Sequence, residues 1–202
     1  MTGRVLTICG SFHPASANRA ALDVATRFLR AQPAIEVCDS ISVARLAPLD
    51  PQQLDVPPEA VALFRREVDE AHAVLVAGPE YAGGVAGSLK NALDWCVGSG
   101  GFYGKPVVVM SAGTSGGAFA IEQLARTLLW QGAHVVAHVG IAGPKSKSDG
   151  AGRLVDPGTL DAIDAACATL VEALTLSDGE RARRASATGV ELGIMDYPHK
   201  PD

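Results

Sequence analysis

A polar loop near the start of the chain gathers residue types that could bind an anion. Residues 10–18 include Ser11, Ser16 and Asn18, and they separate an apolar run at 5–9 from a segment with apolar residues three and four apart. A strand, a small-residue turn and a helix start leave unpaired backbone N–H groups at the positive end of the helix dipole. The pattern therefore fits a phosphate-binding loop, and it fits equally well an ordinary turn in which Ser16 is the helix N-cap.

The composition of this loop restricts the kind of phosphate it would hold. It has neither the Gly-Lys-Ser/Thr ending of a Walker A loop nor the Gly-x-Gly-x-x-Gly pattern of dinucleotide-binding turns. A hydroxyl-rich loop without lysine suits a phosphate monoester held by neutral donors. This favours flavin mononucleotide (FMN) over ATP or tightly bound NAD.

Length and composition indicate one globular domain. The chain has 202 residues, of which 48% are hydrophobic and 19% charged, and its formal net charge of -5 gives no reason to expect a nucleic-acid partner. No apolar run approaches the roughly 20 residues of a membrane helix, and no signal-peptide pattern is present. Four scattered cysteines, Cys9, Cys38, Cys96 and Cys167, lie in apolar segments and are expected to be buried, reduced thiols. We therefore expect a cytoplasmic protein.

Short apolar runs alternate along the chain with segments of helical periodicity. The expected strands cover residues 4–9, 34–39, 73–77, 106–110 and 133–139, and the expected helices end near residues 31, 71, 95, 131 and 176. Such alternation predicts an α/β fold with a parallel sheet between helix layers, a flavodoxin-like three-layer sandwich with five strands in the order 2-1-3-4-5. We expect one domain over residues 1–176, followed by a tail, 177–202, that is disordered or packed on a partner subunit.

This strand order predicts where a ligand would bind. The loops after strands one, three and four converge at the carboxyl edge of the sheet, where the strand order reverses. These are residues 10–18, 78–84 and 111–117, and all three are rich in small residues. Their coincidence favours a binding site over three unrelated turns.

The three loops resemble those of the NAD(P)H-dependent FMN reductase family, which includes quinone, azo-dye and chromate reductases. The resemblance spans about residues 4–140. The first loop resembles Gly-Ser-x-Arg-x-x-Ser-x-Asn, with His13 at the arginine position. The second resembles Pro-Glu-Tyr-Asn, with Ala82 at the asparagine position, and the segment at 89–95, Leu-Lys-Asn-Ala-Leu-Asp-Trp, matches closely.

The resemblance implies a set of FMN-binding residues. Within it, Ser11, Ser16 and Asn18 would bind the phosphate, and the turn beginning at Pro79 would run along the flavin ring. His13 offers fewer donors than arginine and only partial charge, which implies weaker and more pH-dependent binding, or its loss. The complete set is Ser11, His13, Ser16, Ala17, Asn18, Pro79, Glu80, Tyr81, Ala82, Gly83, Ser111 and Gly113.

The resemblance also implies the reaction. A hydride passes from NAD(P)H to bound FMN and then to an acceptor, such as a quinone, free flavin, or an azo or nitro compound, by a ping-pong mechanism without a catalytic side chain. A homodimer or homotetramer is expected, with the helix that carries Trp95 at the interface, and an ordinary core tryptophan is an equal alternative. No metal is expected, because His134 and His138 lie on one face of a strand about 13 Å apart. The alternatives are a flavodoxin-like electron carrier and a flavin-free binding module, and both NADH and NADPH remain open as donors.

Overall fold

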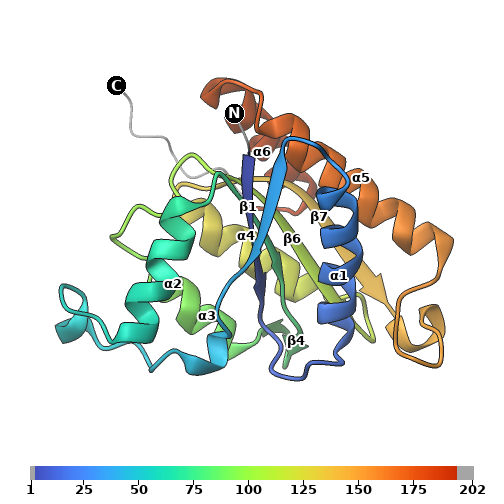
Figure 1. Cartoon of the computed structure of the whole chain (residues 1–202), viewed down its shortest axis with the longest axis horizontal. Coiled ribbons are helices and arrows are strands. Elements are labelled where there is room, and N and C mark those ends of the chain that lie inside the picture. Colours follow the sequence, from blue (N-terminus) through green and yellow to red (C-terminus); the bar gives the residue numbers. More distant parts are fainter. Residues whose placement is uncertain (1–2, 195–202) are drawn as a thin grey trace.

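The protein is built on a parallel five-stranded sheet. The computed structural model describes residues 3–194, and its sheet has the order β2-β1-β3-β6-β7. Its strands are β1 (Gly3–Cys9), β2 (Ile35–Asp39), β3 (Ala73–Ala77), β6 (Pro106–Gly113) and β7 (His134–Ala142), as Figure 1 shows. Numbered by their order in the chain, these strands have the predicted order 2-1-3-4-5. The flavodoxin-like architecture is therefore confirmed.

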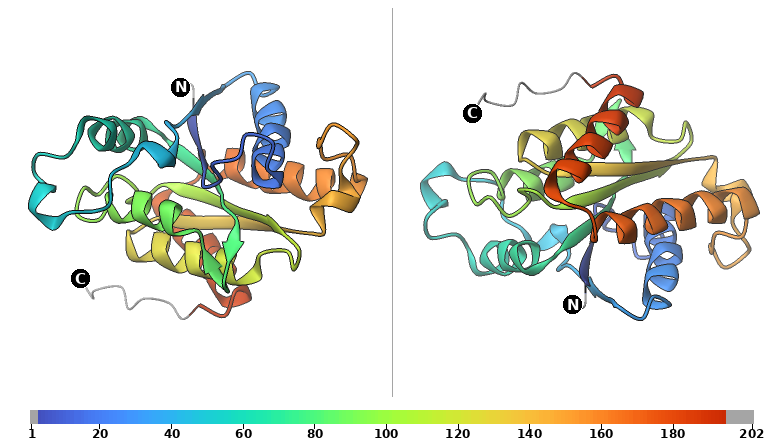
Figure 2. Two further views of the ribbon diagram at one scale, coloured as in Figure 1. Left: turned by 90° about the horizontal axis from the view of Figure 1, so that it is seen from below. Right: turned by 90° about the horizontal axis from the view of Figure 1, so that it is seen from above.

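Helices cover both faces of this sheet. They are α1 (Ala17–Arg30), α2 (Glu59–Glu70), α3 (Gly87–Asp94), α4 (Ala118–Trp130), α5 (Pro157–Ala173) and α6 (Asp178–Glu191). One face packs against α1 and α5, and the opposite face packs against α2, α3 and α4 (Figure 2). Successive strand residues point to opposite faces. Leu6 and Ile8 therefore pack on the side of α2, α3 and α4, while Val5 and Cys9 pack on the side of α1 and α5.

Trp95 is a core residue of this chain. Its side chain is fully buried, and its indole Nε1 donates to the carbonyl of Ala47 at 2.8 Å. Asn91, one turn earlier, donates to the same carbonyl at 3.0 Å and accepts from the Leu49 N–H at 2.8 Å. The two side chains hold the connection at 40–58, in which two short 3-10 turns, η1 (Val43–Arg45) and η2 (Pro51–Gln53), form. Trp95 therefore has no exposed surface with which to anchor a subunit interface.

The sequence predicted that residues 177–202 are either disordered or packed on a partner subunit. In the structure, residues 178–191 of this segment form α6, which packs beside β7 and α4 of the same chain. Ser177 caps the helix, and the Glu180 Oε2 accepts from the Ser177 N–H at 2.9 Å. This capping box, Ser-x-x-Glu, was the available sequence signal. Residues 195–202 of the expected tail lie outside the described residues.

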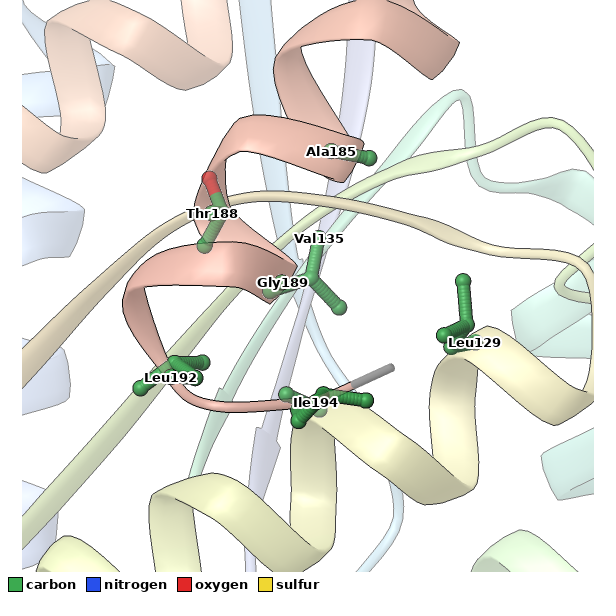
Figure 3. Close-up of a pocket in the computed structure, with 8 residues that line it drawn as sticks. Leu129, Val135, Ala185, Thr188, Gly189, Leu192 and Ile194 are labelled. Carbon is green, nitrogen blue, oxygen red and sulfur yellow. The ribbon is translucent and has the colours of Figure 1, made fainter. Parts of the chain in front are cut away.

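A small apolar pocket marks the contact between α6 and the domain. Leu129 of α4, Val135 of β7 and Ala185 of α6 line it, together with Ile194 (Figure 3). His134 and His138 fasten the same helix at its two ends. The His134 Nε2 lies 3.1 Å from Asp178 Oδ1, and the His138 Nε2 lies 3.4 Å from Glu191 Oε1. The paired histidines thus hold α6.

The cysteines are free thiols. Cys9, Cys96 and Cys167 are buried as predicted, whereas Cys38 is only partly buried. Burial raises the pKa of Cys96 and of Cys167 to about 12, so neither forms a thiolate readily near neutral pH. Within residues 3–194 there is no helix long and apolar enough to cross a membrane. Nor do those residues include a group of three or more His, Cys, Asp or Glu side chains that could hold a metal ion.

Candidate functional site

Three loops meet at the carboxyl edge of the central strands. The Gly10 N–H donates to the Ala77 carbonyl at 2.7 Å, and the Gly78 N–H donates to the Met110 carbonyl at 3.1 Å. These bonds extend the β1–β3 and β3–β6 ladders into the loops. A Cβ at Gly10 would lie 2.7 Å from the Leu89 side chain, and one at Gly78 would lie 2.4 Å from it. Glycine at both positions therefore lets α3 approach the strand ends.

The first loop ends at the amino terminus of α1. Ser16 is the N-cap, which the sequence left open as one of two alternatives, and its Oγ accepts from the Arg19 N–H at 3.1 Å. The N–H groups of Ala17 and Asn18 belong to the first helical turn, so they have no acceptor within the helix. The Ser11 side chain is half-buried in the same loop. These groups form a set of neutral donors at the positive end of a helix dipole.

The Asn18 side chain fastens this loop to β6. It is 3% exposed, its Oδ1 accepts from the Ala112 N–H at 2.9 Å, and its Nδ2 donates to the Ala112 carbonyl at 3.2 Å. These bonds use Oδ1 and one of the two Nδ2 hydrogens, so the second Nδ2–H and the backbone N–H of Asn18 remain as donors for the phosphate contact that the sequence suggested. His13 is exposed, and its Nδ1 accepts from the Ala15 N–H at 3.1 Å. The other ring nitrogen, Nε2, is not part of this bond.

The second loop is a small hairpin that the sequence analysis missed. Strand β4 (Glu80–Tyr81) pairs antiparallel with β5 (Gly84–Val85), and Ala82 and Gly83 form the turn with φ values of 50° and 73°. Two central residues with positive φ are typical of a type I′ turn, which favours Asn-Gly. Ala82 is the sole residue other than glycine with positive φ within residues 3–194. The Ala-Gly pair is a weak hairpin signal, which explains the omission.

Other residues of this loop differ in exposure. Pro79 is buried, and its carbonyl accepts from the Ala86 N–H at 3.2 Å, which closes the base of the hairpin. Tyr81 is exposed, as are Phe12 in the first loop and Phe119 in the first turn of α4. The loops therefore present apolar, planar side chains at the same edge as the neutral donors, which suits a ligand with an aromatic ring system.

Glu80 makes a contact that the sequence did not indicate. Its Oε2 accepts from the Phe119 N–H at 2.9 Å and from the Ala120 N–H at 3.2 Å, and its Oε1 accepts from the Ser115 hydroxyl at 3.3 Å. The N-cap of α4, Gly117, has left-handed backbone and no side chain to supply a cap. Glu80 therefore caps a helix that lies 39 residues away in the chain.

The third loop contributes two predicted FMN-binding residues, Ser111 and Gly113, and both lie within β6. Ser111 is fully buried in β6, and a Cβ on Gly117 would lie 2.0 Å from its Oγ. The Ser111 Oγ is buried without a hydrogen-bond partner in the described part of the chain, and the ligand contact that the sequence suggested for it stays a prediction. Gly113 ends β6, and its carbonyl accepts from Gly116 at 3.2 Å and from Gly143 at 3.1 Å. Thr114 and Ser115 are the exposed hydroxyl residues here.

The donor set fits the phosphate of FMN. The first-turn N–H groups of α1 and the hydroxyls of Ser11 and Ser16 are suited to a monoester. The nearby Arg19 guanidinium is directed to Asp39, at 3.2 Å. A dinucleotide or triphosphate loop would instead show the Lys or glycine pattern that this turn lacks.

Comparison with known proteins decides the family. The model of the NADPH-dependent FMN reductase family matches residues 3–147. The chain belongs to this family. It is 38% identical over 159 residues to an NAD(P)H-dependent FMN reductase of Pseudomonas aeruginosa, a match that covers 76% of this chain and 85% of that protein. It is 30% identical over 165 residues to a quinone reductase of Escherichia coli, with 78% and 88% covered.

A solved structure with the same fold supports the architecture. The flavoenzyme NAD(P)H:(acceptor) oxidoreductase from Paracoccus denitrificans superposes with a TM-score of 0.69 and 23% identity, covering 85% of this chain and 97% of that one. Membership in the FMN reductase family confirms the resemblance seen in the sequence. The protein is thus an oxidoreductase of a family that uses FMN and NAD(P)H.

Proposed function

We propose that this FMN reductase family member transfers hydride from NAD(P)H to FMN at the edge formed by residues 10–18, 78–84 and 111–117. Bound FMN would supply the two-electron chemistry, with a quinone, a free flavin, or an azo or nitro compound as the acceptor. Donor and acceptor use the same place in turn, which is a ping-pong mechanism. The observation that carries the proposal is the meeting of a neutral-donor turn, a hairpin and exposed aromatic side chains at one edge.

Each part of this edge has a separate task. The backbone N–H groups of Ala17 and Asn18, with the hydroxyls of Ser11 and Ser16, hold the phosphate. The backbone of the hairpin would face the flavin ring, and its N–H groups would supply hydrogen bonds to developing negative charge. Since the Glu80 carboxylate is engaged with α4, we assign no side chain as a general acid or base.

We also propose that the protein is a cytoplasmic homodimer or homotetramer. The oligomeric state rests on the family resemblance, and the compartment rests on the composition of the chain and its scattered cysteines. With Trp95 buried inside the chain, an interface would have to use other residues of α3 or of other elements. Light scattering after size-exclusion chromatography measures the mass directly. A monomer in both the apo and the FMN-loaded protein would contradict this proposal.

An anaerobic titration tests the reaction. Protein loaded with FMN is titrated with NADPH, and separately with NADH, while the oxidised-flavin absorption band is followed. We expect about one equivalent of donor to bleach the band, since a hydride carries both electrons, and a quinone to restore it. FMN that binds but stays oxidised with both donors would indicate an electron carrier. Absence of FMN binding would indicate a flavin-free module.

A further inference from the structure

The β4–β5 hairpin depends on α4 for its position. Each of its strands has two residues, and the pair forms a sheet separate from the central one. An isolated hairpin of this size is unstable in water. Its turn, at Ala82 and Gly83, is exposed. Something outside the hairpin must therefore fix it.

Two side-chain contacts supply that connection. The Glu80 carboxylate accepts from the first-turn N–H groups of Phe119 and Ala120, at 2.9 and 3.2 Å. One turn further along α4, the Gln123 Oε1 accepts from the Val85 N–H at 2.7 Å. A Cβ on Gly84 would lie 2.7 Å from that same oxygen, so the amide lies directly against the hairpin backbone.

The two contacts hold both strands at one level of the hairpin. Glu80 and Val85 are directly opposite each other in the β4–β5 register. Glu80 is bonded through its side chain, and Val85 through its backbone. A charged acceptor at a helix N-terminus makes a stronger hydrogen bond than a neutral one, and it also interacts favourably with the helix dipole. The hairpin is thus fixed to α4 at its base while its turn remains free of these contacts.

We propose that Glu80 and Gln123 are positioning residues for FMN, which fix the hairpin that lies along the flavin ring without contacting the cofactor themselves. The inference rests on the proposed function, and it changes the role of Glu80 from ligand to support. Both carboxylate oxygens of Glu80 are engaged by the loop and first turn at 115–120. Tyr81 and Phe119, the exposed neighbours of these contacts, are placed by the same bonds.

The decisive variant is Gln123→Ala, because this side chain bonds to the far strand of the hairpin. Apoprotein is titrated with FMN, and the dissociation constant is measured from the quenching of flavin fluorescence. We expect Glu80→Ala and Gln123→Ala each to raise the constant about tenfold. The double variant should raise the dissociation constant by much less than the product of the two single increases, since either change alone frees the hairpin. Glu80→Gln, which keeps one oxygen acceptor, should fall between wild type and Glu80→Ala.

A cap remote from the site provides the matched control. Ser177 caps α6 by accepting from the Glu180 N–H at 3.4 Å, and α6 begins beside His134 at the opposite edge of the sheet. Ser177→Ala should lower the thermal unfolding midpoint without changing FMN affinity. Amide hydrogen exchange of the apoprotein gives a readout independent of FMN. In Gln123→Ala, the Val85 N–H should exchange faster while the amides of β3 are unchanged.

Three results would overturn the inference. Wild-type FMN affinity in Gln123→Ala, with impaired affinity in Glu80→Ala, would make Glu80 a direct ligand. Equal weakening in Ser177→Ala would make the effect one of general instability. Unchanged exchange at Val85 in Gln123→Ala would show that the hairpin does not depend on this contact. The proposed function is judged separately on wild type, because it fails if wild type does not bind FMN or if FMN-loaded wild type is not reduced by NAD(P)H.

Discussion

Two helix N-termini lie at the same edge of the sheet and are satisfied in different ways. At α1, Ser16 supplies one hydroxyl oxygen to one N–H and leaves the N–H groups of Ala17 and Asn18 without an acceptor in the helix. At α4, Gly117 supplies no side chain, and the Glu80 carboxylate accepts from two N–H groups. Both ends carry about half a positive charge from the helix dipole. They differ in what neutralises it.

The difference distinguishes a helix end suited to bind a ligand from one that stabilises the fold. An N-terminus with a neutral cap keeps positive potential for an external anion, whereas one that holds a carboxylate of its own chain does not. This difference supports the proposal that α1 receives the phosphate of FMN, whereas α4 fixes the hairpin. Two ends that look alike as secondary structure can be assigned different tasks once their acceptors are known.

The largest effect is expected at the α4 end, from Gly117→Ala. The new Cβ would lie 2.0 Å from Ser111 Oγ, and Gly117 has a φ of 71°. Overpacking and a left-handed alanine together should lower the free energy of unfolding by about 3 kcal/mol, measured by urea denaturation. Gly98→Ala is the matched control, because Gly98 has a φ of 81° and nothing within 4 Å of its Cβ position. Equal losses in the two variants would show that packing over Ser111 is unimportant.

The α1 end is tested by Ser16→Ala. Loss of the N-cap should reduce stability by about 1 kcal/mol. The same hydroxyl is proposed to hold the phosphate, so the FMN dissociation constant should rise about tenfold, while riboflavin, which has no phosphate, should bind as in wild type. Glu80→Ala should weaken FMN and riboflavin alike, because it acts through the ring side. A loss of riboflavin affinity in Ser16→Ala would break the distinction between the two ends.

The sheet and the α1 end were predictable because their signals are local. The strand runs are short and mostly apolar, and Ser16 lies immediately before a periodic segment, so hydrophobic period and capping chemistry locate both. The same kind of signal at 177–180, a capping box, was present for α6 but was outweighed by the polar composition of the segment.

The α4 end was not predictable because its contacts are not local. Glu80 and Phe119 are 39 residues apart, and Gln123 and Val85 are 38 residues apart. Nothing in the spacing of either pair indicates that they meet. Ser111 was assigned to the third loop, which was expected to begin after a strand at 106–110, but β6 continues to Gly113 and Ser111 is buried within it. A strand end that is wrong by three residues changes which side chains are exposed.

The hairpin turn gives a smaller effect, of opposite sign. Ala82 has a φ of 50°, which costs an alanine more than an asparagine or a glycine. Ala82→Asn should therefore raise the free energy of unfolding by about 0.5 to 1 kcal/mol, as measured by urea denaturation. Gly83→Ala, at the adjacent position with a φ of 73°, should lower it. A destabilised Ala82→Asn would show that the turn adopts another conformation in solution.

The smallest effect concerns a third N-terminus, that of α5, which has an ionisable cap. Asp156 accepts from the Thr159 hydroxyl at 2.7 Å and from the Thr159 N–H at 2.9 Å, and these bonds lower the pKa of Asp156 below its ordinary value of 3.8. A carboxylate with a depressed pKa stabilises the fold above its unfolded-state pKa, and this stabilisation disappears as the pH falls through the folded-state value. The α1 cap, a serine, has no such dependence.

Asp156→Asn keeps an oxygen acceptor for the Thr159 N–H but cannot ionise. Urea midpoints measured from pH 7 down to about pH 3 should therefore fall less steeply below pH 4 in this variant than in wild type. Ser16→Ala should instead lower the midpoint by a similar amount at every pH, because a hydroxyl does not titrate in this range. Asp161→Asn, at an exposed carboxylate of the same helix, controls for the loss of one negative charge. If Asp156→Asn and Asp161→Asn reduce the fall of the urea midpoint below pH 4 equally, the loss of stability in acid depends on net charge and not on the cap.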